Sequence, residues 1–148
     1  MTFTIDTPPR ELLPHRDPFL FIDRLSEVTE EYTVGHRKFT GEEFFFKGHF
    51  PEYPVVPGVL LIETMAQCGG AGIKVLGTIT GDPIFLLATV EKAKFRQEVK
   101  PGDDVRIVVE NMKITQRIVK QSGKAYVGDA VAAEATWLCI IADSNTGA

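Results

Sequence analysis

One histidine and one glutamate stand where an acid–base pair could work. His49 ends an aromatic run and is followed by three closely spaced prolines, Pro51, Pro54 and Pro57. Prolines at this density exclude a helix and favour an ordered turn. Glu63 is the single acid of the apolar segment that begins after the last proline. Because a histidine can accept a proton near neutral pH and a carboxyl group can donate one, this pair could perform general acid–base chemistry.

The segment that carries Glu63 predicts a helix over residues 57–76. Pro57 suits the first turn, where its missing N–H would have no partner in any case. The N–H groups of that turn, including the one of Gly58, then point outward at the positive end of the helix dipole. Gln67 lies four residues after Glu63, on the same helix face, and could orient the carboxyl group. One segment therefore supplies a base, an acid and an oxyanion donor.

Composition limits the classes of protein that the chain can represent. The 148 residues amount to one domain, 1–148, and 44% of them are hydrophobic. The formal net charge of −4 and the lack of a basic run argue against nucleic-acid binding. Cys68 and Cys139 have no disulfide-rich spacing, which fits a reducing compartment, and Cys68 is expected to be a buried apolar group. No signal peptide is recognisable, and the apolar stretch 55–66 is too short to span a bilayer, so we expect a soluble cytoplasmic protein.

The remaining elements are expected to be strands. Periodicity predicts strands over 25–39, 43–46, 84–99, 105–119 and 125–141. Turn residues predict turns at 100–103 and 121–124. A loop or broken short helix is expected over 12–21 and a frayed tail over 143–148. Three glycines in the predicted helix, at 69, 70 and 72, each cost about 0.8–1 kcal/mol against alanine. They indicate close approach by a sheet or by a second helix. The predicted architecture is α+β, a mostly antiparallel sheet that curls around one long helix.

Three blocks of the sequence resemble a known family. They are residues 13–24, which begin Leu13-Pro14-His15-Arg16, residues 48–59 together with Glu63, and residues 94–103. In the same order they resemble the 3-hydroxyacyl-[acyl-carrier-protein] dehydratases of fatty-acid synthesis, of the FabZ type. The resemblance implies a hot-dog fold and a dimer, often assembled as a trimer of dimers. Glutamate at position 63 resembles the dehydratase-only branch, whereas the FabA branch, which also isomerises the double bond, carries aspartate there.

The resemblance also implies a reaction and a set of roles. Water leaves a (3R)-3-hydroxyacyl thioester to give a trans-2-enoyl thioester. His49 takes the C2 proton, and Glu63 of the other subunit assists the departing hydroxyl group. The Gly58 N–H stabilises the charge on the thioester oxygen, and the Val55 carbonyl accepts a hydrogen bond from the His49 ring. No nucleotide-binding or metal-ligand motif is recognisable, so neither a cofactor nor a metal is expected.

A carrier-protein partner follows from the same resemblance. Acyl carrier protein is acidic, so a local basic patch must overcome the negative charge of this chain. Lys92, Lys94 and Arg96 alternate along a predicted strand and would share one face, with Ala93 and Phe95 facing inward. An ordinary solvated strand face is the alternative. Two further histidines are expected to have no catalytic role: His15 as a structural residue and His36 on the surface.

Two other functions remain open at the level of sequence. A hot-dog thioesterase would share the helix-start oxyanion donor but would not need His49 in its turn. A non-catalytic acyl-thioester-binding protein would have no reason to keep both His49 and Glu63. Neither the preferred acyl length nor the choice between general fatty-acid synthesis and a dedicated pathway, such as lipid A precursor supply, can be inferred from the residues.

Overall fold

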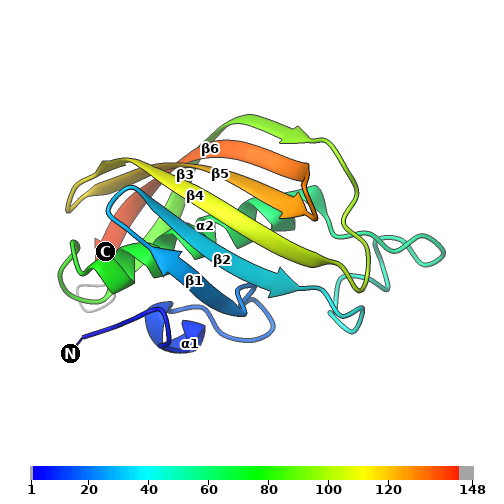
Figure 1. The fold of residues 1–148 in the computed structure, drawn as a ribbon, viewed down its shortest axis with the longest axis horizontal. Helices are drawn as coiled ribbons and strands as arrows, with labels where there is room; N and C mark the ends of the chain where they lie inside the picture. The colour runs from blue at the N-terminus through cyan, green and yellow to red at the C-terminus, as the bar shows by residue number, and fades with distance from the viewer. Residues whose placement is uncertain (1, 144–148) are drawn as a thin grey trace.

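A single antiparallel sheet of six strands forms the frame of the molecule. The computed structural model describes residues 2–143, so most of the predicted frayed tail lies outside the described residues. The strands lie in the order β1-β2-β4-β5-β6-β3 (Figure 1). The bounds are Arg24–Val28 for β1, Tyr32–Lys38 for β2, Pro83–Phe95 for β3, Asp104–Ile114 for β4, Ile118–Val127 for β5 and Ala130–Asp143 for β6. A short helix, α1, covers Pro9–Leu12.

The long helix predicted after the proline turn is present. Helix α2 covers Gly58–Leu76, begins directly after Pro57 and ends at Gly77, whose positive φ of 71° suits glycine. The sheet curves over α2 (Figure 1), and the middle of the helix is buried from Met65 to Ile73 except for Ala66. By length and composition alone α2 could cross a membrane, but most of it is buried inside the fold, as in a core helix. The predicted α+β arrangement is therefore confirmed.

The helix glycines allow the sheet to approach α2 closely. A Cβ atom at Gly72 would lie 1.9 Å from Oγ1 of Thr33 on β2, and one at Gly69 would lie 2.2 Å from Oε1 of Gln121 on β5. Neither distance leaves room for a side chain. The helix glycines therefore mark close approach by the sheet and not by a second helix.

Two of the predicted assignments, one strand and one turn, are wrong. The expected strand 25–39 is the hairpin β1–β2, in which the Thr29 hydroxyl oxygen accepts the backbone N–H groups of residues 31 and 32. The predicted turn 121–124 lies inside β5, and the chain turns instead at 115–117 and 128–129. The misleading residue is Gly123, where a Cβ atom would lie 2.5 Å from the Trp137 ring. Glycine is therefore present at 123 to make room for Trp137 and not to form a turn.

The aromatic run 43–46 is a turn and not the strand that we predicted. Phe45 and Phe46 are buried in the core, and Phe45 packs edge-to-face against Phe21 and Phe39. The Glu43 carboxylate accepts the N–H groups of Thr40 and Gly41, which closes the chain on itself. Core packing and this side-chain cap therefore override the strand propensity of three consecutive phenylalanines.

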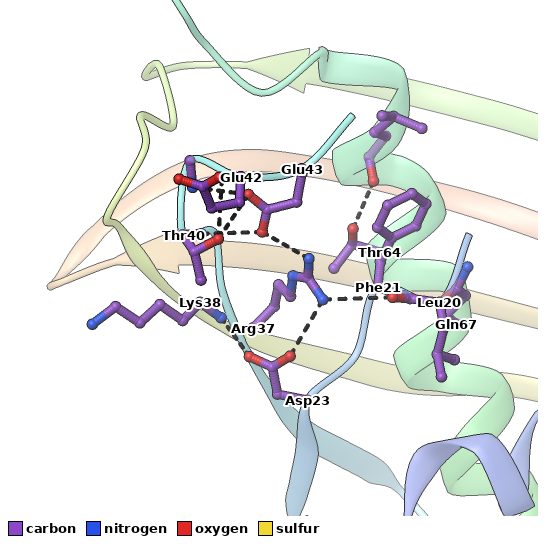
Figure 2. Close-up of polar contacts among 12 residues, drawn as sticks. Leu20, Phe21, Asp23, Arg37, Lys38, Thr40, Glu42, Glu43, Thr64 and Gln67 are labelled. Atoms are coloured by element: carbon purple, nitrogen blue, oxygen red, sulfur yellow. Dashed lines mark hydrogen bonds and ion pairs between the residues drawn. The ribbon is translucent and has the colours of Figure 1, made fainter. Parts of the chain in front are cut away.

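Arg37 on β2 joins this turn to the N-terminal segment. Its guanidinium group donates to the Leu20 carbonyl at 3.5 Å, to Asp23 at 3.3 Å and to Glu43 at 2.9 Å (Figure 2). It also lies over the ring of Phe39, 5.0 Å from the centroid. Although burial alone would raise it, the pKa of Glu43 is held below its ordinary value by the Gly41 and Thr40 N–H groups and by the charge of Arg37. This network fixes the chain just before His49.

Candidate active site

His49 is held in the proline turn by its own neighbours. Its Nδ1 lies 3.1 Å from the Val55 carbonyl oxygen, and the Val55 N–H donates to the His49 carbonyl at 2.9 Å. A carbonyl only accepts hydrogen bonds, so Nδ1 carries the proton and Nε2 keeps a free lone pair. The Val56 N–H donates to the Val99 carbonyl at 2.8 Å, which ties the turn to the segment after β3. The turn therefore presents His49 in the tautomer of a general base.

The start of α2 lies beside this histidine. His49, Val55 and Gly58 line one cleft of about 480 Å³, together with the residues that follow β3. The N–H of Gly58, at the first position of the helix, precedes the intrahelical hydrogen bonds, the first of which are accepted by the Pro57 carbonyl. A Cβ atom at Gly58 would lie 2.8 Å from the Phe95 ring, so this ring covers the helix start. A base and an oxyanion donor therefore open into the same cleft.

Glu63 is held by two side chains on its own chain. Its Oε2 accepts a hydrogen bond from Gln67 Nε2 at 2.9 Å and lies 3.4 Å from His15 Nε2. The buried Gln67 amide is itself fixed, because its Oε1 accepts the Phe21 N–H at 2.8 Å and its Nε2 also donates to the Phe19 carbonyl at 3.0 Å. The spacing of Glu63 and Gln67 indicated their contact, whereas nothing in the sequence analysis placed His15 next to Glu63.

The base and the acid of one chain do not share a cavity. Glu63 lines a cavity of about 20 Å³, with Leu87 of β3 and Cys139 of β6 among its walls, and this cavity has no residue in common with the His49 cleft. Glu63 lies five positions after Gly58 on α2, so the two lie about 140° apart around the helix axis. Each chain therefore carries two candidate half-sites, one around His49 and one around Glu63, in separate cavities.

The two cysteines have no nucleophilic character. Burial raises the pKa of the Cys68 thiol far above its usual range, as expected for a buried apolar group. Burial, with a smaller effect of the Glu63 charge, raises the pKa of Cys139 to about 12. Both thiols are protonated at neutral pH; Cys139 packs in the wall of the Glu63 cavity, and Cys68 packs in the core.

The predicted basic face is irregular. Lys92 has a positive φ of 53°, and the register of β3 against β6 shifts between Glu91 and Lys94, so the regular alternation is broken. Arg96 lies just beyond the end of β3, where it pairs with Glu134 at 3.2 Å and lines the His49 cleft. Phe95, which we expected to face inward, is 52% exposed because it lies at the sheet edge over the helix start. All three cations are nevertheless exposed, and Arg96 lines that cleft.

Comparison with known proteins defines the class of this protein. A family model described as a FabA-like domain matches residues 13–136, which is most of the chain. Among solved structures, the dehydratase heterocomplex ApeI:P from Xenorhabdus doucetiae has a TM-score of 0.79 over 93% of each chain. Its sequence identity is 14%, so this likeness concerns the fold alone. The chain is therefore a FabA-like domain with the hot-dog fold.

Curated relatives narrow the class further. The chain is 49% identical to "3-hydroxyacyl-[acyl-carrier-protein] dehydratase FabZ" of Desulforamulus reducens, over 85% of this chain and 89% of the relative. It is 46% identical to the protein of the same name from Fusobacterium nucleatum, over 88% of this chain and 92% of the relative. The chain belongs to the FabZ family of 3-hydroxyacyl-[acyl-carrier-protein] dehydratases. The family resemblance expected from the three sequence blocks is thus confirmed.

Proposed function

We propose that this protein dehydrates (3R)-3-hydroxyacyl chains on acyl carrier protein to trans-2-enoyl chains, in a site built from His49 of one subunit and Glu63 of another. The observation that carries this proposal is the separation of the two residues within one chain, in cavities that share no residue. An acid–base pair must flank a single substrate, so each half-site needs a second copy to complete it. The cytoplasm, where we place the protein, fits the two buried, unpaired thiols.

The edge strand supports a specific arrangement of that second copy. Strand β3 ends the sheet, and its residues from Leu87 to Phe95 are exposed, as expected for an edge that pairs with another chain. Leu87 lines the Glu63 cavity, and Phe95 lines the His49 cleft, about 20 Å further along, because the bulged segment between them spans six residues of β6. Antiparallel pairing of β3 with its copy, centred near Glu91, would bring Leu87 of one subunit opposite Phe95 of the other. The two half-sites would then meet twice per dimer, and three such dimers could form the trimer of dimers.

The proposed chemistry uses the groups that each half-site presents. Nε2 of His49 takes the proton from C2, and the electron pair of that bond forms the C2–C3 double bond as the C3–O bond breaks. Negative charge that develops on the thioester oxygen is stabilised by the Gly58 N–H at the positive end of α2. Glu63 gives its proton to the departing hydroxyl group, which leaves as water. Transfer of a proton from His49 back to Glu63 restores the resting site. Gln67 keeps the carboxyl group in place throughout.

The cations beside the His49 cleft are proposed as the docking site for acyl carrier protein. Lys92 and Lys94 are exposed on β3, and Arg96 lines the cleft itself, so an acidic carrier docked there would deliver its thioester to His49. Glu134 engages Arg96 and lowers the positive charge available there. The two lysines therefore carry most of the proposed attraction.

The reaction class can be tested with one substrate and two readouts. The purified protein is mixed with a 3-hydroxyacyl thioester, and formation of the conjugated enoyl group is followed by absorbance while free thiol is measured in parallel. We expect enoyl product without thiol release, and loss of this product in the His49→Ala protein. Thiol release without enoyl formation would instead identify a thioesterase. Binding without either product would identify a non-catalytic acyl-thioester-binding protein.

A further inference from the structure

We infer that His15 is a positioning residue of the reaction: together with Gln67 it holds one oxygen of the Glu63 carboxyl group, so that the other oxygen faces the substrate. Both neighbours approach Oε2, Gln67 Nε2 at 2.9 Å and His15 Nε2 at 3.4 Å. Within residues 2–143, no hydrogen bond or ion pair reaches Oε1. The inference rests on the proposed role of Glu63 as the acid.

The direction of the two contacts follows from their chemistry. The Gln67 amide cannot flip, because its oxygen accepts the Phe21 N–H, and so its NH₂ group faces Oε2. A carboxylate oxygen accepts hydrogen bonds, so the His15 nitrogen that faces it carries a proton. Oε2 therefore accepts the Gln67 hydrogen bond and lies within ion-pair distance of His15 Nε2, and Oε1 is the oxygen left to exchange a proton with the substrate hydroxyl group. Contacts of this kind are often long in a free enzyme and shorten when substrate binds.

The other ring nitrogen argues against a purely structural histidine. Nδ1 of His15 is buried and has no hydrogen-bond partner among the described residues. Buried polar atoms without partners are rare, because they lose their contacts with water and gain nothing in return. An apolar side chain of similar volume would fill this place at no such cost. The imidazole is therefore explained by the contact of its Nε2 with Glu63.

The segment around His15 is itself anchored. The Arg16 guanidinium group donates to the carbonyls of Leu13 at 2.9 Å and of His15 at 2.7 Å. Further along, Arg37 reaches the Leu20 carbonyl from β2 (Figure 2). The same segment thus supplies the His15 ring and the backbone groups that orient Gln67. It therefore holds Glu63, which lies 48 residues after His15 in the sequence, through His15 and Gln67.

Two variants of matched size separate positioning from packing. In His15→Gln the side-chain amide can place an N–H donor where Nε2 lies, whereas His15→Leu fills a similar volume without a donor. We expect His15→Leu to lower kcat by about 10- to 100-fold with KM changed less than about 3-fold, because a misplaced acid slows the chemical step. His15→Gln should recover most of the lost kcat. Thermal melting should show that both proteins are folded, and if His15→Leu is not, His15→Asn, whose amide is too short to reach Oε2, takes its place.

The same measurements include the outcomes that would overturn the inference. A wild-type kcat in His15→Leu would overturn the inference. Equal losses of kcat in His15→Leu and His15→Gln, at unchanged melting temperature, would also overturn it. Glu63→Gln, assayed in parallel, separates this inference from the role of Glu63. If Glu63→Gln retains wild-type kcat, Glu63 is not the acid and the inference loses its basis. If Glu63→Gln is inactive while His15→Leu is fully active, only the role of His15 is wrong.

Discussion

At the residue scale, the proposed chemistry depends on which nitrogen of His49 carries a proton and on what covers the start of α2. The Val55 carbonyl fixes the proton on Nδ1, so the basic lone pair of Nε2 faces the cleft. The Gly58 N–H opens into the same cleft beneath the Phe95 ring. Since neither the carbonyl nor the N–H belongs to a side chain, substitutions at these positions must act on the backbone to test their roles.

Gly58 offers such a test. Replacement by proline removes the N–H, and proline is tolerated at the first helical position because its φ fits a helix. The preceding Pro57 already has φ −56° and ψ 133°, which a following proline requires. We expect Gly58→Pro to lower kcat by about 10²–10³-fold relative to Gly58→Ala, the loss typical of one oxyanion-hole donor.

The alanine variant is the control for this comparison. It adds a Cβ atom against the Phe95 ring, as proline does, but it keeps the N–H. Steady-state kinetics on both proteins, with melting temperatures to confirm folding, measures the difference. Equal kcat values for the two variants would remove Gly58 from the oxyanion site.

Residue types alone predicted much of the site, and its remaining part depends on contacts between distant segments. Local spacing predicted the Glu63–Gln67 contact and placed Gly58 at a helix start. His15 was read as a structural residue because its neighbour Glu63 lies far away in the chain. No local pattern encodes how the N-terminal segment crosses α2, so this contact could be found only in the folded molecule.

At the element scale, side-chain caps set boundaries that periodicity did not predict. The ends of α2 were predictable because proline and glycine restrict the backbone on their own. The hairpin turns depend instead on Thr29 and Thr115, whose hydroxyl groups accept backbone N–H groups two and three residues ahead. Gly123 was read as a turn residue, although it serves the packing of Trp137. A glycine can mark either a turn or a close contact, and only the fold distinguishes the two.

The turn over residues 40–43 gives an element-scale prediction about pH. The pKa of Glu43 is lowered in the folded protein, so its ionised form stabilises the fold above the ordinary carboxyl range. That contribution is lost as the pH falls through the lowered pKa. We expect Glu43→Gln to reduce the free energy of unfolding by about 1–3 kcal/mol at neutral pH, because Arg37 loses a charged partner.

Urea unfolding at neutral and acidic pH measures this contribution. The difference between wild type and Glu43→Gln should shrink as the solution becomes acidic. Glu42→Gln is the matched control, because Glu42 is adjacent and exposed, and it should change the unfolding free energy little at any pH. A difference that stays constant with pH, or an equal effect at position 42, would contradict the role given to the Glu43 carboxylate.

At the scale of the whole molecule, the proposed reaction requires a second copy of the chain and a carrier protein. The exposed edge strand β3 carries the residues that connect to both: Leu87 at the Glu63 cavity, Phe95 at the His49 cleft and the two lysines between them. The sequence predicted a strand that carries the two lysines but not the interrupted ladder of β3, because the bulges arise from pairing with β6. Assembly and docking can therefore be tested on one strand.

Carrier docking predicts a selective effect of charge reversal. Replacing Lys92 and Lys94 together by glutamate should raise the apparent KM for carrier-linked substrate several-fold, because the carrier is acidic. Added salt should also raise the apparent KM of the wild-type enzyme for carrier-linked substrate, because it screens the attraction between the charges. Small pantetheine-linked substrates, which have no carrier surface, should be affected little.

A control for general charge effects is available on β4. Lys113 is exposed there, away from the residues that line the His49 cleft, and Lys113→Glu should leave both KM values unchanged. Equal responses of carrier-linked and pantetheine-linked substrates to the double replacement would show that the two lysines do not form a docking site.

An active site shared between two subunits can be tested by complementation between two inactive chains, one without His49 and one without Glu63. His49→Ala and Glu63→Gln should each inactivate the enzyme, because every site in either dimer lacks one group. A mixed dimer has one site with both groups and one site with neither. Co-refolding equal amounts makes about half of the dimers mixed, so about a quarter of wild-type enoyl formation should return. No recovery, despite mixed dimers confirmed by mass spectrometry, would contradict a site built from His49 of one subunit and Glu63 of the other.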